Sequence, residues 1–176
     1  MSNNTKSLTL CALMISVALV LSYIERFIPL QMLVPLPGIK LGLANIVTLF
    51  ALFFWGTKYA FIILILRCLL GAFFGGNVSG LFFSLTGGIL AMLAMNFCEK
   101  IRGISIYGIS MIGAAVHNIG QILAAILLMN SIYVVSYLPY LLMVSVFTGI
   151  ITGSLCAGVF KNLQKSGQIP EIVEKN

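Results

Sequence analysis

Long apolar runs, separated by short polar or glycine-containing breaks, dominate the pattern of the chain. A helix needs roughly 20 apolar residues to cross about 30 Å of hydrocarbon. Six runs approach that length, and each is predicted to be a transmembrane helix: about 8–24, 41–57, 59–74, 78–98, 104–130 and 137–160. The pattern therefore predicts a single six-helix transmembrane domain over residues 1–162, followed by a short polar cytoplasmic tail over 163–176.

Composition agrees with a polytopic membrane protein. Hydrophobic residues make up 60% of the chain and charged residues 8%, which lies outside the range of soluble globular domains. The first run lacks a small-x-small cleavage site before Glu25-Arg26 and exceeds a usual signal-peptide core, so a retained helix is predicted. The expected fold class is an all-α bundle of six transmembrane helices.

The distribution of lysine and arginine predicts the orientation. With the N-terminus inside, only Arg26 and Lys40 fall on the outer side. The inner side then carries Lys6, Lys58, Lys100, Arg102, Lys161, Lys165 and Lys175. This bias predicts that both termini are cytoplasmic. It also explains the net charge of +6 without a nucleic-acid partner, because the cations lie at helix ends rather than in one patch.

The segment 37–45 places a lysine and an asparagine at the start of the second apolar run. The Pro37-Gly38 turn leads directly to Lys40, and Asn45 follows about 7 Å deeper, with Thr48 one turn further on the same face. Snorkelling of Lys40, and interhelical hydrogen bonds of the other two, are the structural alternatives. Polar groups inside a membrane persist mainly where they face protein or a cavity, so the segment predicts a site.

Further polar residues fall inside the third and fifth runs. Arg67 lies near the bilayer midplane, where an arginine costs about 2.5–3.5 kcal/mol on insertion scales. It either forms a structural tie to backbone carbonyls or Glu25, or lines a substrate site. His117 lies in the outer half, beside Asn118 and one turn from Gln121. A lone histidine is more often a satisfied interior group, whereas this cluster favours a ligand-facing role.

Most of these groups gather in the outer half, which predicts a pocket open to the outside rather than a continuous pore. The apolar external loop 25–40 is expected to lie over it. The intramembrane charge is basic, which points to an anionic or acceptor-rich ligand. The predicted substrate-binding residues are Lys40, Asn45, Thr48, Arg67, Asn77, His117, Asn118 and Gln121.

Small residues recur at four-residue spacing in two of the runs. Ala12 and Ser16 lie in the first run, and Gly149, Gly153 and Ala157 in the sixth. Such ladders let helices approach closely, either within the chain or in docking on a partner membrane subunit. No Walker-type phosphate loop is present, so active transport would need ATPase subunits supplied by other chains.

The remaining chemistry is sparse. The four cysteines stand singly in apolar runs, so no metal site, disulfide framework or cofactor is predicted. The chain has no aspartate, and its acids are Glu25, Glu99, Glu171 and Glu174. An intramembrane enzyme is disfavoured because no acid–base pair lies within the bilayer.

Three motifs carry a resemblance that covers about residues 6–162. They are Leu36-Pro37-Gly38-Ile39-Lys40-Leu41-Gly42-Leu43-Ala44-Asn45, Leu66-Arg67 to Leu70-Gly71, and Ala115-Val116-His117-Asn118-Ile119-Gly120-Gln121. Together they resemble the bacterial Gx transporter family, also named heptaprenyl diphosphate synthase component I. That family is similar to the S components of energy-coupling factor (ECF) transporters.

The resemblance implies a six-helix protein with an outward pocket and both termini inside the cell. It also implies that a small-xxx-small motif in the first helix docks on a coupling subunit that carries two ATPases. Ala12 and Ser16 match that motif, with serine in place of the second alanine.

The synthase name is at odds with the composition. Trans-prenyl transferases resemble one another in paired D-D-x-x-D motifs, whose carboxylates hold magnesium against diphosphate. A chain without aspartate is not expected to be that catalytic subunit. Two functions follow: the substrate-capturing membrane subunit of an ECF-type uptake transporter, which is preferred, or a non-catalytic membrane partner of a prenyl diphosphate synthase or quinone-pathway enzyme.

Overall fold

The computed structural model describes residues 3–28 and 40–166, and every regular element in these two ranges is helical. Most of the predicted covering loop, including Pro37-Gly38, lies outside the described residues. The all-α bundle predicted from the apolar runs is confirmed. Its elements are α1 (Asn3–Ile24), η1 (Glu25–Phe27), α2 (Asn45–Trp55), α3 (Thr57–Gly75), α4 (Val78–Glu99), α5 (Ile106–Met129), η3 (Ile132–Tyr137) and α6 (Leu138–Lys165).

Five of the helices are long and apolar enough to cross a membrane, namely α1, α3, α4, α5 and α6. The second run was predicted over 41–57, but α2 starts at Asn45 and has 11 residues. At the helical rise this is about 16 Å, roughly half of the hydrocarbon thickness. Residues 40–44 are not helical, and Gly42 has a φ of 83°, a conformation that favours glycine. The second apolar run is therefore a half-length helix preceded by irregular backbone.

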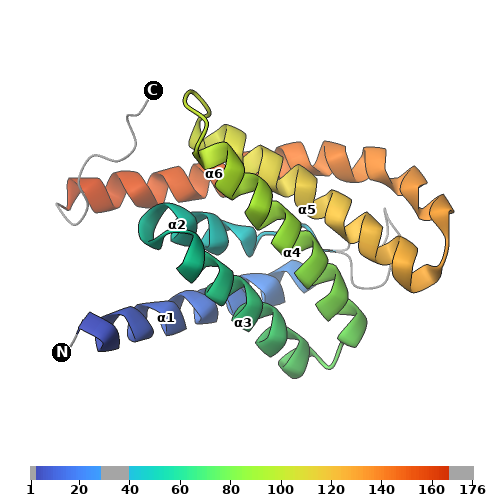
Figure 1. The fold of residues 1–176 in the computed structure, drawn as a ribbon, viewed down its shortest axis with the longest axis horizontal. Coiled ribbons are helices and arrows are strands. Elements are labelled where there is room, and N and C mark those ends of the chain that lie inside the picture. Colours follow the sequence, from blue (N-terminus) through green and yellow to red (C-terminus); the bar gives the residue numbers. More distant parts are fainter. Residues whose placement is uncertain (1–2, 29–39, 167–176) are drawn as a thin grey trace.

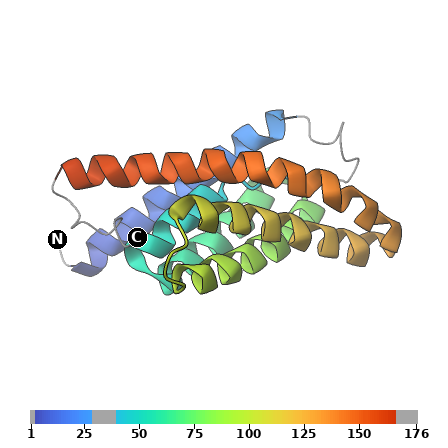
Figure 2. The same ribbon diagram turned by 90° about the horizontal axis from the view of Figure 1, so that it is seen from above.

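The short helix α2 lies at the centre of the bundle (Figure 1). It contacts each of the other five α-helices, and most of its side chains are buried. Helix α5 packs against both α4 and α6, whereas α1 contacts only α2 and α3 among the α-helices. The long helices run in roughly one common direction, as Figure 2 shows from above. Thus α2 is the buried core element, and α1 is a peripheral one.

Close approach of α5 to its two neighbours depends on glycine. A Cβ at Gly120 of α5 would lie 2.7 Å from the Cα of Gly87 in α4, and one at Gly149 of α6 would lie 2.5 Å from the Cα of Met111 in α5. Gly153 meets α5 in the same way, at Tyr107. The predicted ladder in α6 therefore packs within the chain, since van der Waals contact between close backbones holds helices together in lipid.

The two ends of the bundle differ in charge. The terminal end is the one where α1 begins and α6 ends, at the left of Figure 1. Lys58, Lys100 and Lys165 flank helix ends there, and Thr57 Oγ1 donates a hydrogen bond of 2.5 Å to Asn96 Oδ1 between α3 and α4. The opposite end, where α2 begins, carries Lys40 and is called the Lys40 end below.

Candidate ligand-binding site

The irregular backbone at Lys40 is held by one side chain of α5. The backbone N–H of Lys40 donates to Gln121 Oε1 at 3.3 Å, and Gln121 Nε2 donates to the Lys40 carbonyl at 2.9 Å. Gln121 is fully buried. Its side-chain amide therefore satisfies both the N–H and the carbonyl of Lys40, which in a helix would be satisfied by backbone hydrogen bonds. Non-helical backbone at membrane depth is tolerated where it is buried in protein in this manner.

Glu25 satisfies the next part of the same segment. Its Oε1 accepts hydrogen bonds from the backbone N–H groups of Gly42 and Leu43, the latter at 3.1 Å, and its side chain is only 4% exposed. The residue follows α1, so these bonds tie the end of α1 to the entry of α2. Burial raises the pKa of the Glu25 carboxyl above its ordinary value, while the Leu43 N–H and the Lys40 charge oppose that rise.

Arg67 of α3 reaches α2. Its Nη2 donates a hydrogen bond of 2.9 Å to Asn45 Oδ1, and the side chain is 6% exposed. Among the described residues the Arg67 Nε has no hydrogen-bond partner. The two predicted site residues are therefore brought together, and Asn45 rather than a carboxylate is the partner of the arginine. The amide supplies no counter-charge, and Glu25 is the described acid that interacts electrostatically with the guanidinium.

His117 lies in a slot between two glycines. A Cβ at Gly42 would lie 2.8 Å from His117 Cδ2, and one at Gly87 would lie 2.8 Å from His117 Nδ1. His117 Nε2 and Gln121 Nε2 share a hydrogen bond of 2.8 Å. The histidine therefore sets the position of Gln121, which in turn holds Lys40.

A cavity of about 330 Å³ lies beside these residues, between the ends of α1 and α3 and next to α4. Its polar lining includes Lys40 and Arg67, and Lys40 Nζ donates a hydrogen bond of 2.8 Å to Ser84 Oγ of α4. The volume is within the range of small-molecule sites, which join an apolar lining to a few polar groups. The other lining residues are Leu19, Val20, Ser22, Tyr23, Cys68, Gly71, Phe74 and Gly75.

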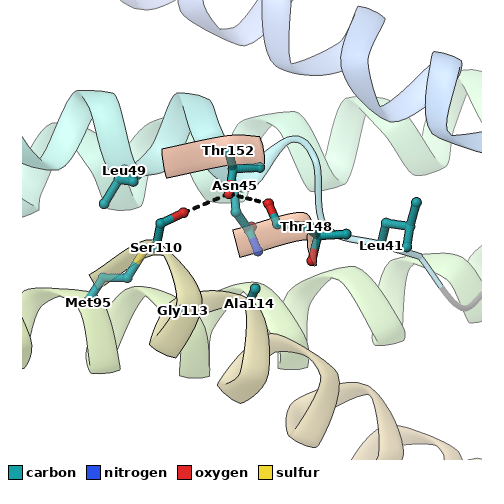
Figure 3. Close-up of a pocket in the computed structure, with 10 residues that line it drawn as sticks. Leu41, Asn45, Leu49, Met95, Ser110, Gly113, Ala114, Thr148 and Thr152 are labelled. Carbon is teal, nitrogen blue, oxygen red and sulfur yellow. Dashed lines mark hydrogen bonds between the residues drawn. The ribbon is translucent and has the colours of Figure 1, made fainter. Parts of the chain in front are cut away.

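A second, much smaller cavity lies on the far side of Asn45, against α5 and α6 (Figure 3). It holds about 10 Å³, roughly the room for one water molecule. Ser110 Oγ and Thr152 Oγ1 share a hydrogen bond of 2.7 Å at its edge, and Asn45 Nδ2 has no partner among the described residues. This pocket is too small for a ligand larger than a single water molecule.

The other predicted site residues lie apart from the large cavity. Thr48 is buried on α2, and Asn118 Nδ2 donates to the carbonyl of Leu141 at 2.8 Å, which joins α5 to α6. Asn77 is exposed and caps α4, with its Oδ1 accepting from the Gly80 N–H at 2.9 Å. Neither these three residues nor His117 and Gln121 line the large cavity.

Sequence reasoning left several site residues out. Ser22, Tyr23 and Ser84 line the large cavity but were not among the predicted substrate-binding residues. Thr148 and Thr152 carried a signal, because residues four apart share one face of a helix. That polar stripe on the sixth run predicts a polar contact with a neighbouring helix.

The predicted docking pair lies on the periphery. Ala12 and Ser16 are both exposed on α1, and Ser16 Oγ donates to the Ala12 carbonyl at 2.9 Å. Within the described ranges, no three His, Cys, Asp or Glu side chains gather into a group that suits a metal ion.

Comparison with known proteins gives one match. A family model described as heptaprenyl diphosphate synthase component I matches residues 14–159, in agreement with the resemblance seen in the three motifs. No curated protein and no solved structure matches the chain. The match covers most of the chain, from within α1 to within α6, and the chain therefore belongs to the heptaprenyl diphosphate synthase component I family.

Proposed function

We propose that this protein is the substrate-capturing subunit of an ECF-type uptake transporter in a bacterial cell membrane, and that it is not an enzyme. One observation carries the proposal: a cavity of about 330 Å³ inside a membrane-type helical bundle, lined by Lys40 and Arg67. Intramembrane ionisable groups that face a cavity mark substrate sites by default. A protein serving only as an anchor would need no such cavity.

The cation distribution supports an outward-facing site. Lys58, Lys100, Arg102 and Lys165 lie at the terminal end, which the positive-inside rule assigns to the cytoplasm. The large cavity lies at the Lys40 end and so faces outward. A ligand from outside binds there, and release inward is driven by ATPase partners.

In this proposal the site residues divide into two groups. Lys40 and Arg67 contact the ligand, because both line the cavity. Asn45, Gln121 and His117 are positioning residues, because their hydrogen bonds lead to Arg67 or Lys40. The exposed Ala12 and Ser16 on α1 form the proposed contact with a transmembrane coupling subunit, since small residues allow close helix approach.

A native mass spectrum of the detergent-purified chain tests ligand capture directly. We expect a retained small molecule, lost from the Lys40→Ala, Asn45→Ala double variant while its thermal transition persists. The double variant should also fail in uptake. Normal uptake by this variant would refute the site.

Co-purification from the native membrane tests the transporter assignment. We expect a coupling subunit and ATPases to accompany the wild-type chain and to be lost from an Ala12→Leu, Ser16→Leu variant that still retains ligand. A soluble prenyl diphosphate synthase in their place would support the second candidate, a non-catalytic membrane partner of that enzyme. The family's description as a component of a heptaprenyl diphosphate synthase favours that candidate.

A further inference from the structure

We infer that the small cavity next to Asn45 is a binding site for one water molecule, and that this water holds the Asn45 amide in the orientation that accepts from Arg67. The water site depends only on the lining of the small cavity, whereas its importance for ligand binding rests on the proposed function. Three features carry the inference: the direction of the Asn45 amide, the hydrogen atoms of the facing hydroxyls, and the size of the cavity.

The direction of the Asn45 amide is fixed by Arg67. A guanidinium has donors only, so the atom that receives the 2.9 Å bond from Arg67 Nη2 must be the Asn45 oxygen. The amide nitrogen therefore carries two N–H donors away from Arg67, and it has no partner among the described residues. Asn45 is 7% exposed and lines the small cavity together with Gly42, where a Cβ would lie 2.9 Å from Asn45 Nδ2. This buried donor needs an acceptor, because an unsatisfied buried N–H group is costly.

The hydroxyls on the facing helices offer acceptors. Thr152 Oγ1 donates to the Thr148 carbonyl at 2.7 Å, which uses its single hydroxyl hydrogen. Ser110 is therefore the donor in the 2.7 Å bond that it shares with Thr152, drawn as a dashed line in Figure 3. Thr148 Oγ1 donates within its own helix, to the carbonyls of Val144 at 3.2 Å and Ser145 at 3.3 Å. Since each hydroxyl hydrogen is used, Ser110 and Thr148 have lone pairs available at the cavity.

A water molecule matches this set of one donor and two acceptors. It accepts from Asn45 Nδ2 and donates its two hydrogen atoms to Ser110 Oγ and Thr148 Oγ1. Buried waters typically make about three such bonds, and the cavity of about 10 Å³ has roughly the room for one. A metal cation would meet the N–H groups of Asn45, and an anion would meet the lone pairs of the two hydroxyls. The lining therefore selects a neutral molecule that both donates and accepts.

The water joins Arg67 to the far side of the bundle. Ser110 lies on α5 and Thr148 on α6, whereas Asn45 begins α2 and Arg67 lies on α3. With the water bound, the Asn45 amide is satisfied on both sides and its oxygen stays on Arg67. Without it, the amide would turn its N–H groups toward other acceptors and release Arg67. Ser110 and Thr148 are thus positioning residues for a cation that lines the large cavity.

Crystal structures of the full chain, grown in a lipidic mesophase and at a resolution that shows ordered water, test the site directly. We expect a single peak about 2.7–3.2 Å from Asn45 Nδ2, Ser110 Oγ and Thr148 Oγ1. A cavity without a peak, or a direct bond from Asn45 Nδ2 to one of the hydroxyls, would overturn the inference. An anomalous signal at this position in crystals grown in a rubidium salt would identify a cation and would also overturn it.

Matched threonine variants test the positioning role. Thr148→Val keeps the shape of the side chain but removes an acceptor, so the peak should be lost and the bond from Arg67 to Asn45 broken. Thr148→Ser keeps the hydroxyl and should retain both. Thr86→Val is the control, because Thr86 Oγ1 also donates to a carbonyl four residues earlier, that of Phe82, and lines neither cavity. A bond from Arg67 to Asn45 that persists in Thr148→Val after the peak is lost would refute the positioning role. The wild-type structure decides the water site even if this variant fails to fold.

Native mass spectra of the same variants connect the water to ligand capture. We expect Thr148→Val to retain at least about ten-fold less of the small molecule than Thr86→Val does, as the loss of a buried hydrogen bond would give. If the peak is present but the wild-type chain retains no molecule, the proposed function fails and the water site stands. If a molecule is retained and no peak is found, the water site is wrong and the proposed function stands.

Discussion

The two ends of α2 lie in different surroundings, because one packs among aromatic rings and the other forms hydrogen bonds with polar side chains. Toward the terminal end, Phe50 packs on Phe160 of α6 with ring centroids 5.1 Å apart, in a cluster completed by Phe53, Phe54 and Trp55. Toward the Lys40 end, α2 begins at Asn45, which accepts from Arg67. One end of the helix is held by rings, and the other by hydrogen bonds that each need one particular partner.

The difference separates stability from recognition. Aromatic rings pack with many neighbours and direct no ligand, and in lipid they contribute through van der Waals contact. Buried polar networks are costly unless satisfied, so they are retained mainly where they have a function. The aromatic cluster is therefore expected to dominate the free energy of unfolding, and the Lys40 end to dominate ligand affinity.

Phe160→Ala should give the largest effect on stability. Removing a fully buried ring costs about 3–5 kcal/mol of unfolding free energy. Denaturant titration of the purified protein measures this loss, and a native mass spectrum should show ligand retention unchanged for the folded fraction. Loss of the retained ligand from the folded Phe160→Ala protein would contradict the division between the two ends.

Asn45→Ala and Thr57→Val form a matched pair at opposite ends. Each removes one side-chain hydrogen bond across the bundle, to Arg67 and Asn96 respectively, at a cost of about 1–3 kcal/mol in unfolding free energy. Only Asn45→Ala should also weaken binding of the retained ligand, because it releases Arg67 from its position. Equal losses of affinity in the two variants would show that recognition is not confined to the Lys40 end.

Glu25→Gln should give the smallest effect, and it should depend on pH. Glutamine keeps an oxygen for the N–H groups of Gly42 and Leu43 but removes the negative charge near Lys40 and Arg67. An anionic ligand should then bind about three-fold more tightly at pH values above the raised pKa of Glu25, where the wild-type carboxyl is ionised.

The wild-type protein should approach that affinity as the pH falls through the raised pKa of Glu25. Because the folded state holds this proton more tightly than the unfolded state, the stability contributed by Glu25 is complete below the unfolded pKa. It is lost as pH rises through the folded pKa. Binding measured across pH should be flat for Glu25→Gln. A persisting pH dependence would show that a group other than Glu25 titrates.

Local pattern was sufficient for most of the fold. The predicted runs 59–74 and 78–98 correspond closely to α3 and α4, because a hydrophobic stretch of helical length is a local property of the sequence. Asn45, Arg67 and His117 could also be identified from the local pattern, as polar residues inside apolar runs. Their residue types and depth required no knowledge of neighbours.

The sequence pattern did not predict which side chains would contact one another across the bundle. Hydropathy predicted a full second span, but Gln121 and Glu25 satisfy the backbone before Asn45, so α2 needs only 11 residues. The role of His117 as a ligand-facing residue stays a prediction, and the slot in which it lies is formed by Gly42 and Gly87, from two other segments of the chain. Neither outcome is encoded by spacing along one helix.

The sequence by itself thus determined that the chain is a bundle of membrane helices with basic groups buried near one end. Only the tertiary structure decided which of those groups line a cavity and which hold others in place. The physical reason is that burial in lipid follows from the local apolar content of a segment. Hydrogen-bond partners and empty volume depend on how segments far apart in the chain, such as α1 and α3, come together.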